Sequence, residues 1–300
     1  MNNPAFSSQS VSPQIETADQ MLYCLARFFN QYLSCEPEQV AVLSVWTLHT
    51  YCFSAARTTP YLNICSHEKQ SGKTLCLELL SLLCAGSWYA TGITPAALAK
   101  KIMKSRPAVL LDECQTIFGS SDKQVRGLLV SGAKSSGIYE GASAVNVFCP
   151  KAFAGMPVLP PAIDDRSIPI LLHPVKPGAP IQRFVPERAI KEAESLVAAL
   201  RQWAGHNQTA LREIAPYTRE QFPPELSPRE QDLVEPLLQI ADRIGGKVPE
   251  QIRSCLVEIL QHDSAKSCFT QLLADIHDAY GNNSRDRLPS AALLDSLNSI

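Results

Sequence analysis

The chain has 300 residues, of which 45% are hydrophobic and 19% charged, and its formal net charge is −2. This composition excludes a chain that is disordered throughout, because it supplies enough apolar side chains for a buried core. The near-neutral charge excludes a basic surface spread over the whole chain, and the most apolar stretch, residues 75–85 with Glu78 inside it, is shorter than the ~20 residues of a membrane span.

Two features of the sequence indicate a cytoplasmic protein. Residues 1–13 are polar and lack the basic segment of a signal peptide. The ten cysteines include no C-x-x-C pair, and Cys65, Cys76 and Cys149 lie in apolar runs. This pattern is typical of buried free thiols in a reducing compartment and argues against a zinc site.

The sequence predicts four parts along the chain. Residues 1–13 form a flexible polar arm, and residues 14–172 alternate helical patterns with short apolar runs, which favours an α/β core with helices at its start. Residues 173–185 contain three prolines and are interpreted as a linker, and residues 186–300 contain helical patterns alone. The expected helices cover residues 187–214, 228–244, 249–261, 267–280 and 290–297.

A strand–loop–helix segment carries the first chemical motif. A short apolar strand is expected over residues 61–66 and an apolar helix over residues 75–84. Phosphate-binding loops between such elements follow G-x-x-x-x-G-K-[ST]. Here Gly72, Lys73 and Thr74 match, whereas His67 replaces the first glycine. The residues expected to surround a phosphate are His67, Glu68, Lys69, Gln70, Ser71, Gly72, Lys73 and Thr74.

A second motif follows 39 residues after Lys73. Residues 108–111 are apolar and end in Asp112 and Glu113. In phosphate-loop ATPases, a buried strand beside the loop strand ends in an acid that holds the magnesium shell, and a following Glu polarises the attacking water. The alternative interpretation is a strand that ends by chance in two solvated acids.

Together these motifs resemble a family. The sequence is similar to the uncharacterised phosphate-loop ATPase domain of phage, plasmid and integrative-element proteins, which is often linked to primase or helicase-like modules. The resemblance extends from about Val40 to the C-terminus. It is carried by residues 46–51, 66–74, 110–113, 126–129, 151–155 and 165–170.

The resemblance implies a RecA/AAA+-like parallel sheet flanked by helices, with ATP and Mg²⁺ as cofactors. Lys73 would then contact the β/γ-phosphate oxygens, while Thr74 and Asp112 hold Mg²⁺. Glu113 would orient the attacking water. Hydrolysis of ATP is the expected reaction.

Arg166 is a further candidate catalytic residue. It precedes the apolar run 168–172, a position that suits an arginine finger acting on the nucleotide of a neighbouring copy in a ring-shaped homo-oligomer. The alternative is an ion pair with Asp164 or Asp165. Lys151 is considered as a polar sensor at the end of its own strand.

The evidence for a nucleic-acid partner is divided. Residues 1–185 carry 15 Lys/Arg and 12 Asp/Glu, and a predicted helix after Thr94 ends in the basic segment 100–106, which is either a phosphate contact or a solvated helix end. A hairpin expected from residues 136–141 and 144–148 offers Glu140 and no Lys or Arg.

Three functions therefore remain open. The first is a DNA-dependent motor, a helicase or replication ATPase of a mobile element that acts on single-stranded or duplex DNA. The second is a nucleotide-gated regulatory or defence switch without translocation. The third is a nucleotide-binding scaffold without turnover. No membrane partner is expected.

The end of the chain predicts one more helix. Ser290 is a suitable N-cap for residues 291–297, and Leu293, Leu294 and Leu297 share one apolar face. In the family, more sequence follows and packs as a small winged-helix-like unit. The sequence therefore suggests a shortened or trimmed form.

Overall fold

The computed structural model describes residues 15, 17–66, 68–119, 123–140, 144–155, 159–261, 276 and 290. The chain forms two compact units, Met1–Ile259 and Leu260–Ile300. Every described residue other than 260, 261, 276 and 290 belongs to the first unit. The helices expected over residues 267–280 and 290–297 lie outside the described residues, apart from positions 276 and 290.

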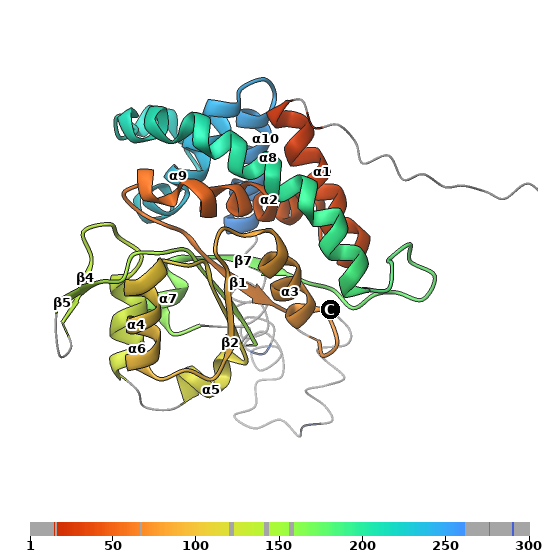
Figure 1. Ribbon diagram of the computed structural model, residues 1–300, viewed down its shortest axis with the longest axis horizontal. Coiled ribbons are helices and arrows are strands. Elements are labelled where there is room, and N and C mark those ends of the chain that lie inside the picture. The colour runs from red at the N-terminus through yellow and green to blue at the C-terminus, as the bar shows by residue number, and fades with distance from the viewer. Residues whose placement is uncertain are drawn as a thin grey trace, which may run out of the picture. The chain divides into compact units, whose positions relative to one another are not determined.

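A five-stranded parallel sheet forms the centre of the first unit (Figure 1). Every residue of its three inner strands is buried, as expected for strands covered by helices on both faces. The expected α/β fold with a parallel sheet is confirmed. From one edge to the other the strands are β2 (Trp88–Thr91), β3 (Val109–Asp112), β6 (Lys151–Ala154), β1 (Tyr61–Cys65) and β7 (Ser167–Leu171).

Helices cover both faces of this sheet (Figure 1). On one face lie α2 (Pro37–Cys52), α3 (Lys73–Leu83) and α8 (Pro186–Glu213). On the other face lie α4 (Pro95–Ser105), α6 (Lys123–Ser131) and α7 (Pro161–Asp164). The remaining helical elements are α1 (Ala18–Tyr32), α5 (Cys114–Gly119), α9 (Pro228–Ile244), α10 (Val248–Gln261) and the 3₁₀ turns η1 (Phe53–Ala55) and η2 (Arg219–Gln221).

Local capping explains where two of the helices begin. The Thr94 hydroxyl accepts a hydrogen bond from the Ala97 amide at 3.3 Å, and Pro95 follows at the first helical position of α4. Ser227 and Glu230 form a reciprocal capping box at the start of α9. Within the described residues, no helix combines the length and the apolarity that crossing a membrane requires.

A small hairpin lies beside α4 and α6. Strands β4 (Ile138–Glu140) and β5 (Ala144–Asn146) pair antiparallel, which confirms the expected hairpin. At its base, Lys134 forms an isolated bridge with Thr58, just before β1. Because parallel strands all run in one direction, this base lies at the edge of the sheet where the strands begin, called the amino edge below.

The topology directs attention to the opposite, carboxyl edge. The chain leaves β1 through α3 toward β2 at one side of the sheet, whereas it leaves the neighbouring β6 through α7 toward β7 at the other side. In open α/β sheets, ligands bind beyond the carboxyl ends of the strands at such a reversal of direction. The loop after β1 and the end of β6 therefore mark the expected position of a site.

The expected linker lies within the first unit. Residues 173–185 run as non-helical chain, and two of their amides bond the end of α1 and the segment after it: the His173 amide donates to the Ser34 carbonyl at 3.0 Å and the Gln182 amide to the Gln31 carbonyl at 2.7 Å. These bonds fix the segment that leads from β7 into α8.

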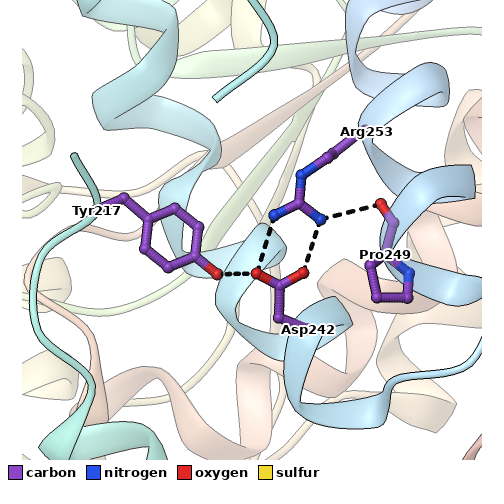
Figure 2. A network of polar contacts seen from close by, with 4 residues as sticks. All are labelled: Tyr217, Asp242, Pro249 and Arg253. Carbon is purple, nitrogen blue, oxygen red and sulfur yellow. Dashed lines mark hydrogen bonds and ion pairs between the residues drawn. The ribbon is translucent and has the colours of Figure 1, made fainter. Parts of the chain in front are cut away.

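A polar network joins the helices that follow α8 (Figure 2). Arg253 of α10 donates to both carboxylate oxygens of Asp242 in α9, at 2.6 and 2.9 Å, and to the Pro249 carbonyl at 3.2 Å. The Tyr217 hydroxyl donates to the same carboxylate. Burial alone would raise the pKa of Asp242, but the bonds from Arg253 and Tyr217 outweigh it, so that this pKa is lowered.

We expect Asp242→Asn to reduce the free energy of unfolding by about 1 kcal/mol at pH 7, because the pair is bidentate yet partly exposed. A lowered carboxyl pKa stabilises the fold fully above the pKa of unfolded aspartate, ~3.9, and this contribution is lost as pH falls through the lower folded value. Urea unfolding of the wild type and Asp242→Asn between pH 7 and pH 3 measures this contribution to the free energy of unfolding. Arg188→Gln, in an exposed pair with Glu192, is the control with a smaller change; a difference that grows as pH falls would contradict the account.

Candidate active site

The loop between β1 and α3 is wrapped around the Lys73 side chain. The Lys73 ammonium donates to the Ser71 hydroxyl at 3.1 Å and to the Glu68 carbonyl at 3.3 Å. Ser71 is buried, whereas Glu68 and Gln70 are exposed. The loop thus folds back toward the first residue of α3, whose ammonium is bonded to two of the loop's oxygens.

Two residues of this loop have left-handed backbone conformations. Gln70 has a φ of 60° and Gly72 a φ of 88°. Glycine is favoured at the second position, because L side chains rarely adopt such angles. Successive turns of this kind aim backbone N–H groups into a shared concavity that suits an anion. His67, in the place of the motif's first glycine, lies outside the described residues.

The start of α3 adds to this anion-binding geometry. Gly72 is the N-cap, so Lys73 and Thr74 occupy the first helical turn. The free amides and the dipole of a helix N-terminus favour negative charge. Thr74 is exposed on this turn, where a ligand can reach its hydroxyl.

The two acids lie at the end of β3, also at the carboxyl edge. Asp112 is 6% exposed, and its carboxylate accepts hydrogen bonds from the Tyr89 hydroxyl at 2.7 Å and from the Glu113 amide at 2.8 Å. Glu113 itself is exposed, with a left-handed φ of 51°. Such a conformation is rare for a non-glycine residue and is found mostly where a site constrains the chain.

Tyr89 is the site residue that the sequence does not reveal. It lies on the edge strand β2 opposite Leu110, two pairs before Thr91 meets Asp112. Burial, and then the hydrogen bond to Asp112, raise the pKa of Tyr89, so that the phenol remains a donor. Only the pairing of β2 with β3 brings this hydroxyl to the acid, and no local motif encodes that pairing.

The sequence interpretation placed the strand that ends in Asp112 beside the strand that precedes the Lys73 loop. In the structure the two strands are not adjacent. Strand β6 lies between β1 and β3: Ile64 of β1 pairs with Ala154, and Leu111 of β3 pairs with Phe153. Because β6 runs parallel to both, the three strands still end together. One strand therefore separates the Lys73 loop from Asp112 and Glu113.

Gly155 directly follows this middle strand and fits closely against the acid segment. Its φ is 123°, and a Cβ atom built on it would lie 2.3 Å from the Gln115 side-chain oxygen, 3.0 Å from the Cys114 nitrogen and 3.2 Å from the Glu113 Cα. A side chain here would push the backbone after Asp112 out of place. Glycine at this position therefore sets the position of Glu113.

Lys151 does not act as a polar sensor, because it lies at the wrong end of its strand. It is the first residue of β6, at the amino edge, and is 0% exposed. Its ammonium donates to four oxygens of neighbouring segments at 2.9–3.4 Å. Burial lowers its pKa. The acceptors are the hydroxyl of Tyr61 and the carbonyls of Gly132, Val147 and Cys149.

Arg166 also lies at the amino edge, away from the other candidate residues. Its carbonyl accepts from the amide of Tyr61, the first residue of β1, at 2.8 Å, and its guanidinium donates to the Ala162 carbonyl. The five residues of β1 extend over about 16 Å. Arg166 is thus one strand length away from the phosphate-type loop of its own chain.

The basic segment that ends α4 is exposed. Lys100, Lys104 and Arg106 are exposed, and the Lys101 ammonium lies 5.5 Å from the centre of the Trp88 ring. Arg106 has a left-handed φ of 41° at the C-cap. Both the nucleic-acid interpretation and the solvated-helix interpretation are compatible with this surface.

Comparison with known proteins assigns no activity to this chain. Residues 172–300 match a family model described as "Protein of unknown function (DUF3631)". This match covers the second part of the range over which the resemblance was expected; the Lys73 loop and the Asp112–Glu113 pair lie outside it. No protein of curated function matches the sequence.

Among solved structures, the one titled "The X-ray structure of JCV Helicase" aligns with this chain at a TM-score of 0.38 and 12% sequence identity. The alignment covers 76% of this chain and 61% of that chain. The present chain thus spans less than two thirds of that protein.

Proposed function

We propose that this protein is a Mg²⁺-dependent ATPase of the phosphate-loop class. The observation that carries the proposal is the arrangement at the carboxyl edge of the sheet. A loop that bonds the Lys73 ammonium follows β1, and a buried Asp112 with an exposed Glu113 after it ends β3, with only β6 between the two strands. Phosphate cradling, magnesium coordination and activation of water need these three groups side by side.

Each group has a definite role in this proposal. The loop amides and Lys73 hold the phosphates, while Thr74 and Asp112 hold the Mg²⁺ shell. Mg²⁺, when bound, neutralises charge on the transferred phosphoryl group. Glu113 accepts the proton of the attacking water, and its exposure leaves its carboxylate accessible to that water.

Lys73→Ala tests the proposal directly. We expect about a 10- to 100-fold loss of ATP affinity, because a charge-assisted hydrogen bond to phosphate contributes about 1.5–3 kcal/mol. Titration with a fluorescent ATP analogue measures the affinity, and circular dichroism checks the fold. Lys69→Ala, an exposed lysine of the same loop, is the matched control with a smaller loss. Unchanged ATP binding and turnover in Lys73→Ala would refute the assignment.

Tyr89→Phe tests the support of the magnesium ligand. Removal of the hydroxyl takes one of two hydrogen bonds from the Asp112 carboxylate. Groups that orient a metal ligand typically contribute 10- to 100-fold in metal affinity. We expect half-maximal ATP turnover to need about tenfold more Mg²⁺, with ATP affinity little changed. Tyr139→Phe, a tyrosine of the hairpin, is the control, and an unchanged Mg²⁺ requirement would remove Tyr89 from the site.

A DNA-dependent motor of a phage or other mobile element is the biological role we propose for this activity. The support is the net positive charge of residues 1–185 and the exposed basic end of α4. Phosphate contacts need such clustered cations. ATP turnover that rises several-fold with single-stranded or duplex DNA would support the motor.

One observation favours the second candidate, a nucleotide-gated switch. The described residues of the hairpin contain Glu140 as their one charged residue, and Ile138 is 57% exposed. An exposed apolar side chain suits a protein partner better than a phosphate backbone. In the same assay, turnover that is unaffected by DNA supports the switch, and nucleotide binding without turnover supports a scaffold.

We further propose that the active form is a homo-oligomer in which Arg166 acts on the nucleotide of a neighbouring copy. The support is its distance from the loop of its own chain. A head-to-tail contact joins the amino edge of one copy to the carboxyl edge of the next, and such contacts close into rings when the rotation permits.

A further inference from the structure

A pocket at the amino edge of the sheet contains Arg166 and four further charged residues, which the proposal for Arg166 does not involve. It opens between the segment before β1, the start of β7 and the first turn of α9, and encloses about 50 Å³. A water molecule needs about 10–15 Å³ of such space, so a tetrahedral oxyanion has room. Its charged lining residues are Lys134, Asp165, Arg166, Arg229 and Asp232.

Two guanidinium groups share this pocket. Arg229 is paired with the Asp165 carboxylate at 3.2 Å, in an ion pair with both side chains about half exposed. Burial and then the charge of Arg229 lower the pKa of Arg166, although Tyr61 and Asp165 oppose this. The two cations therefore repel each other, and three cations face two carboxylates.

This electrostatic arrangement suits an added anion. An oxyanion between Arg166 and Arg229 would replace their repulsion by two attractive contacts, and guanidinium groups match phosphoryl oxygens in geometry. The Asp165–Arg229 pair is exposed enough to be exchanged, because ion pairs of this kind contribute little net stability.

The source of the phosphoryl group follows from the fold. The pocket and the Lys73 loop lie at opposite edges of one sheet, so no single chain brings them together. When ATP is bound at the carboxyl edge of a second copy, its terminal phosphate is negative, which is complementary to the positive charge of the pocket.

We propose that Arg166 and Arg229 form a two-arginine site for the terminal phosphate of ATP bound to a second copy of this chain, with Asp165 as the resident anion that the phosphate displaces. This inference rests on the proposed ATPase function and adds Arg229 and Asp165 to it. Arg229 holds the phosphate beside Arg166, and Asp165 offsets part of the positive charge of the pocket until the phosphate binds.

The first test measures inorganic phosphate binding by calorimetry, which needs no hydrolysis. The wild type is expected to bind phosphate, Asp165→Asn several-fold more tightly, and Arg229→Ala at least about tenfold more weakly. Arg219→Ala, an exposed arginine of η2 outside the pocket, is the matched control with unchanged binding. Equal phosphate binding by wild type and Arg229→Ala would overturn the site.

The second test measures ATP turnover against protein concentration. Arg229→Ala should lower turnover at saturating ATP by about tenfold or more while ATP affinity stays the same, because each nucleotide is held by its own loop. Loss of Arg229 also frees Asp165 to pair with Arg166. The double variant Arg229→Ala/Asp165→Asn separates the effects: continued low turnover supports direct contact by Arg229, and full recovery would overturn it.

Failure of the two proposals is distinguishable. If the wild type binds phosphate through Arg229 but hydrolyses no ATP at any concentration, the ATPase proposal fails and the anion pocket is supported. If the wild type hydrolyses ATP and Arg229→Ala matches it in both tests, the two-arginine site is overturned and the ATPase is not.

Discussion

Replacement of Glu113 by Gln should lower ATP turnover by about 10²–10⁴-fold, the range that a positioned general base contributes. The amide has nearly the shape of the carboxylate but cannot accept the proton of the attacking water. The hydrogen bond from the Glu113 backbone amide to Asp112 survives the change, so the magnesium ligand stays in place. ATP binding is therefore expected to remain close to that of the wild type.

Single-turnover hydrolysis and equilibrium nucleotide binding, measured on the same protein, separate the two effects. Glu140→Gln, an exposed glutamate of the hairpin, is the control for loss of one negative charge. Asp112→Asn should instead raise the Mg²⁺ requirement. If Glu113→Gln lost ATP binding while Asp112→Asn kept full turnover, the roles of the two acids would be wrong.

Sequence patterns predicted the elements that carry the site, because each is encoded locally. A run of apolar residues before a Gly-Lys-Thr triplet defines a buried strand, a turn and a helix, and the structure has β1, the loop and α3 there. The run that ends in Asp112 is β3, and the helix expected over residues 228–244 is α9 with the same bounds.

The order of the strands could not be predicted in the same way. The sequence interpretation put the acid strand beside the loop strand, yet β6 separates them. Pairing between strands that are far apart in the chain depends on helix packing and burial over the whole sheet, not on a local pattern. Tyr89 was missed for this reason, since its contact with Asp112 depends on the pairing of β2 with β3.

The sequence also does not show which end of a strand a boundary residue occupies. Lys151 was a candidate polar sensor because it borders an apolar run. It is the first residue of β6 and therefore lies at the amino edge, where Gly132 leaves room for its ammonium. Gly155, four residues later, is at the carboxyl edge, where a Cβ atom built on it would lie 3.2 Å from the Glu113 Cα. A sequence motif alone does not show at which edge of the sheet a residue lies. The direction of the strand decides this.

The surroundings of Arg166 include a residue that the sequence did not suggest. The sequence offered an ion pair with Asp164 or Asp165 as the alternative role of Arg166, and the structure adds Arg229, 63 positions beyond Arg166, which is paired with Asp165. Long-range contacts of this kind have no sequence signature. Because of this contact, Asp165, Arg166 and Arg229 form one cluster of charges, which a bound anion can rearrange.

Arg166→Ala should lower ATP turnover by about 10³–10⁵-fold if its guanidinium stabilises the transition state on a neighbouring copy, a loss equal to about 4–7 kcal/mol of barrier. Because Arg166 lies about one strand length from the Lys73 loop of its own chain, ATP binding should be unaffected. Wild-type turnover should rise more steeply than linearly with protein concentration as copies associate.

Mixing of two inactive variants tests action between copies. Arg166→Ala keeps an intact loop and Lys73→Ala keeps an intact arginine, so a mixed oligomer contains contacts that pair the two intact groups. Turnover should recover on mixing in proportion to such contacts, up to about a quarter of the wild-type value for random pairing at equal amounts, since one contact in four has both groups. Arg243→Ala, an exposed arginine of α9 outside the pocket, serves as the control and should be active alone. If the mixture stays inactive while size-exclusion chromatography shows that the variants co-assemble, Arg166 does not act across the contact, because every other requirement of the reaction is then present.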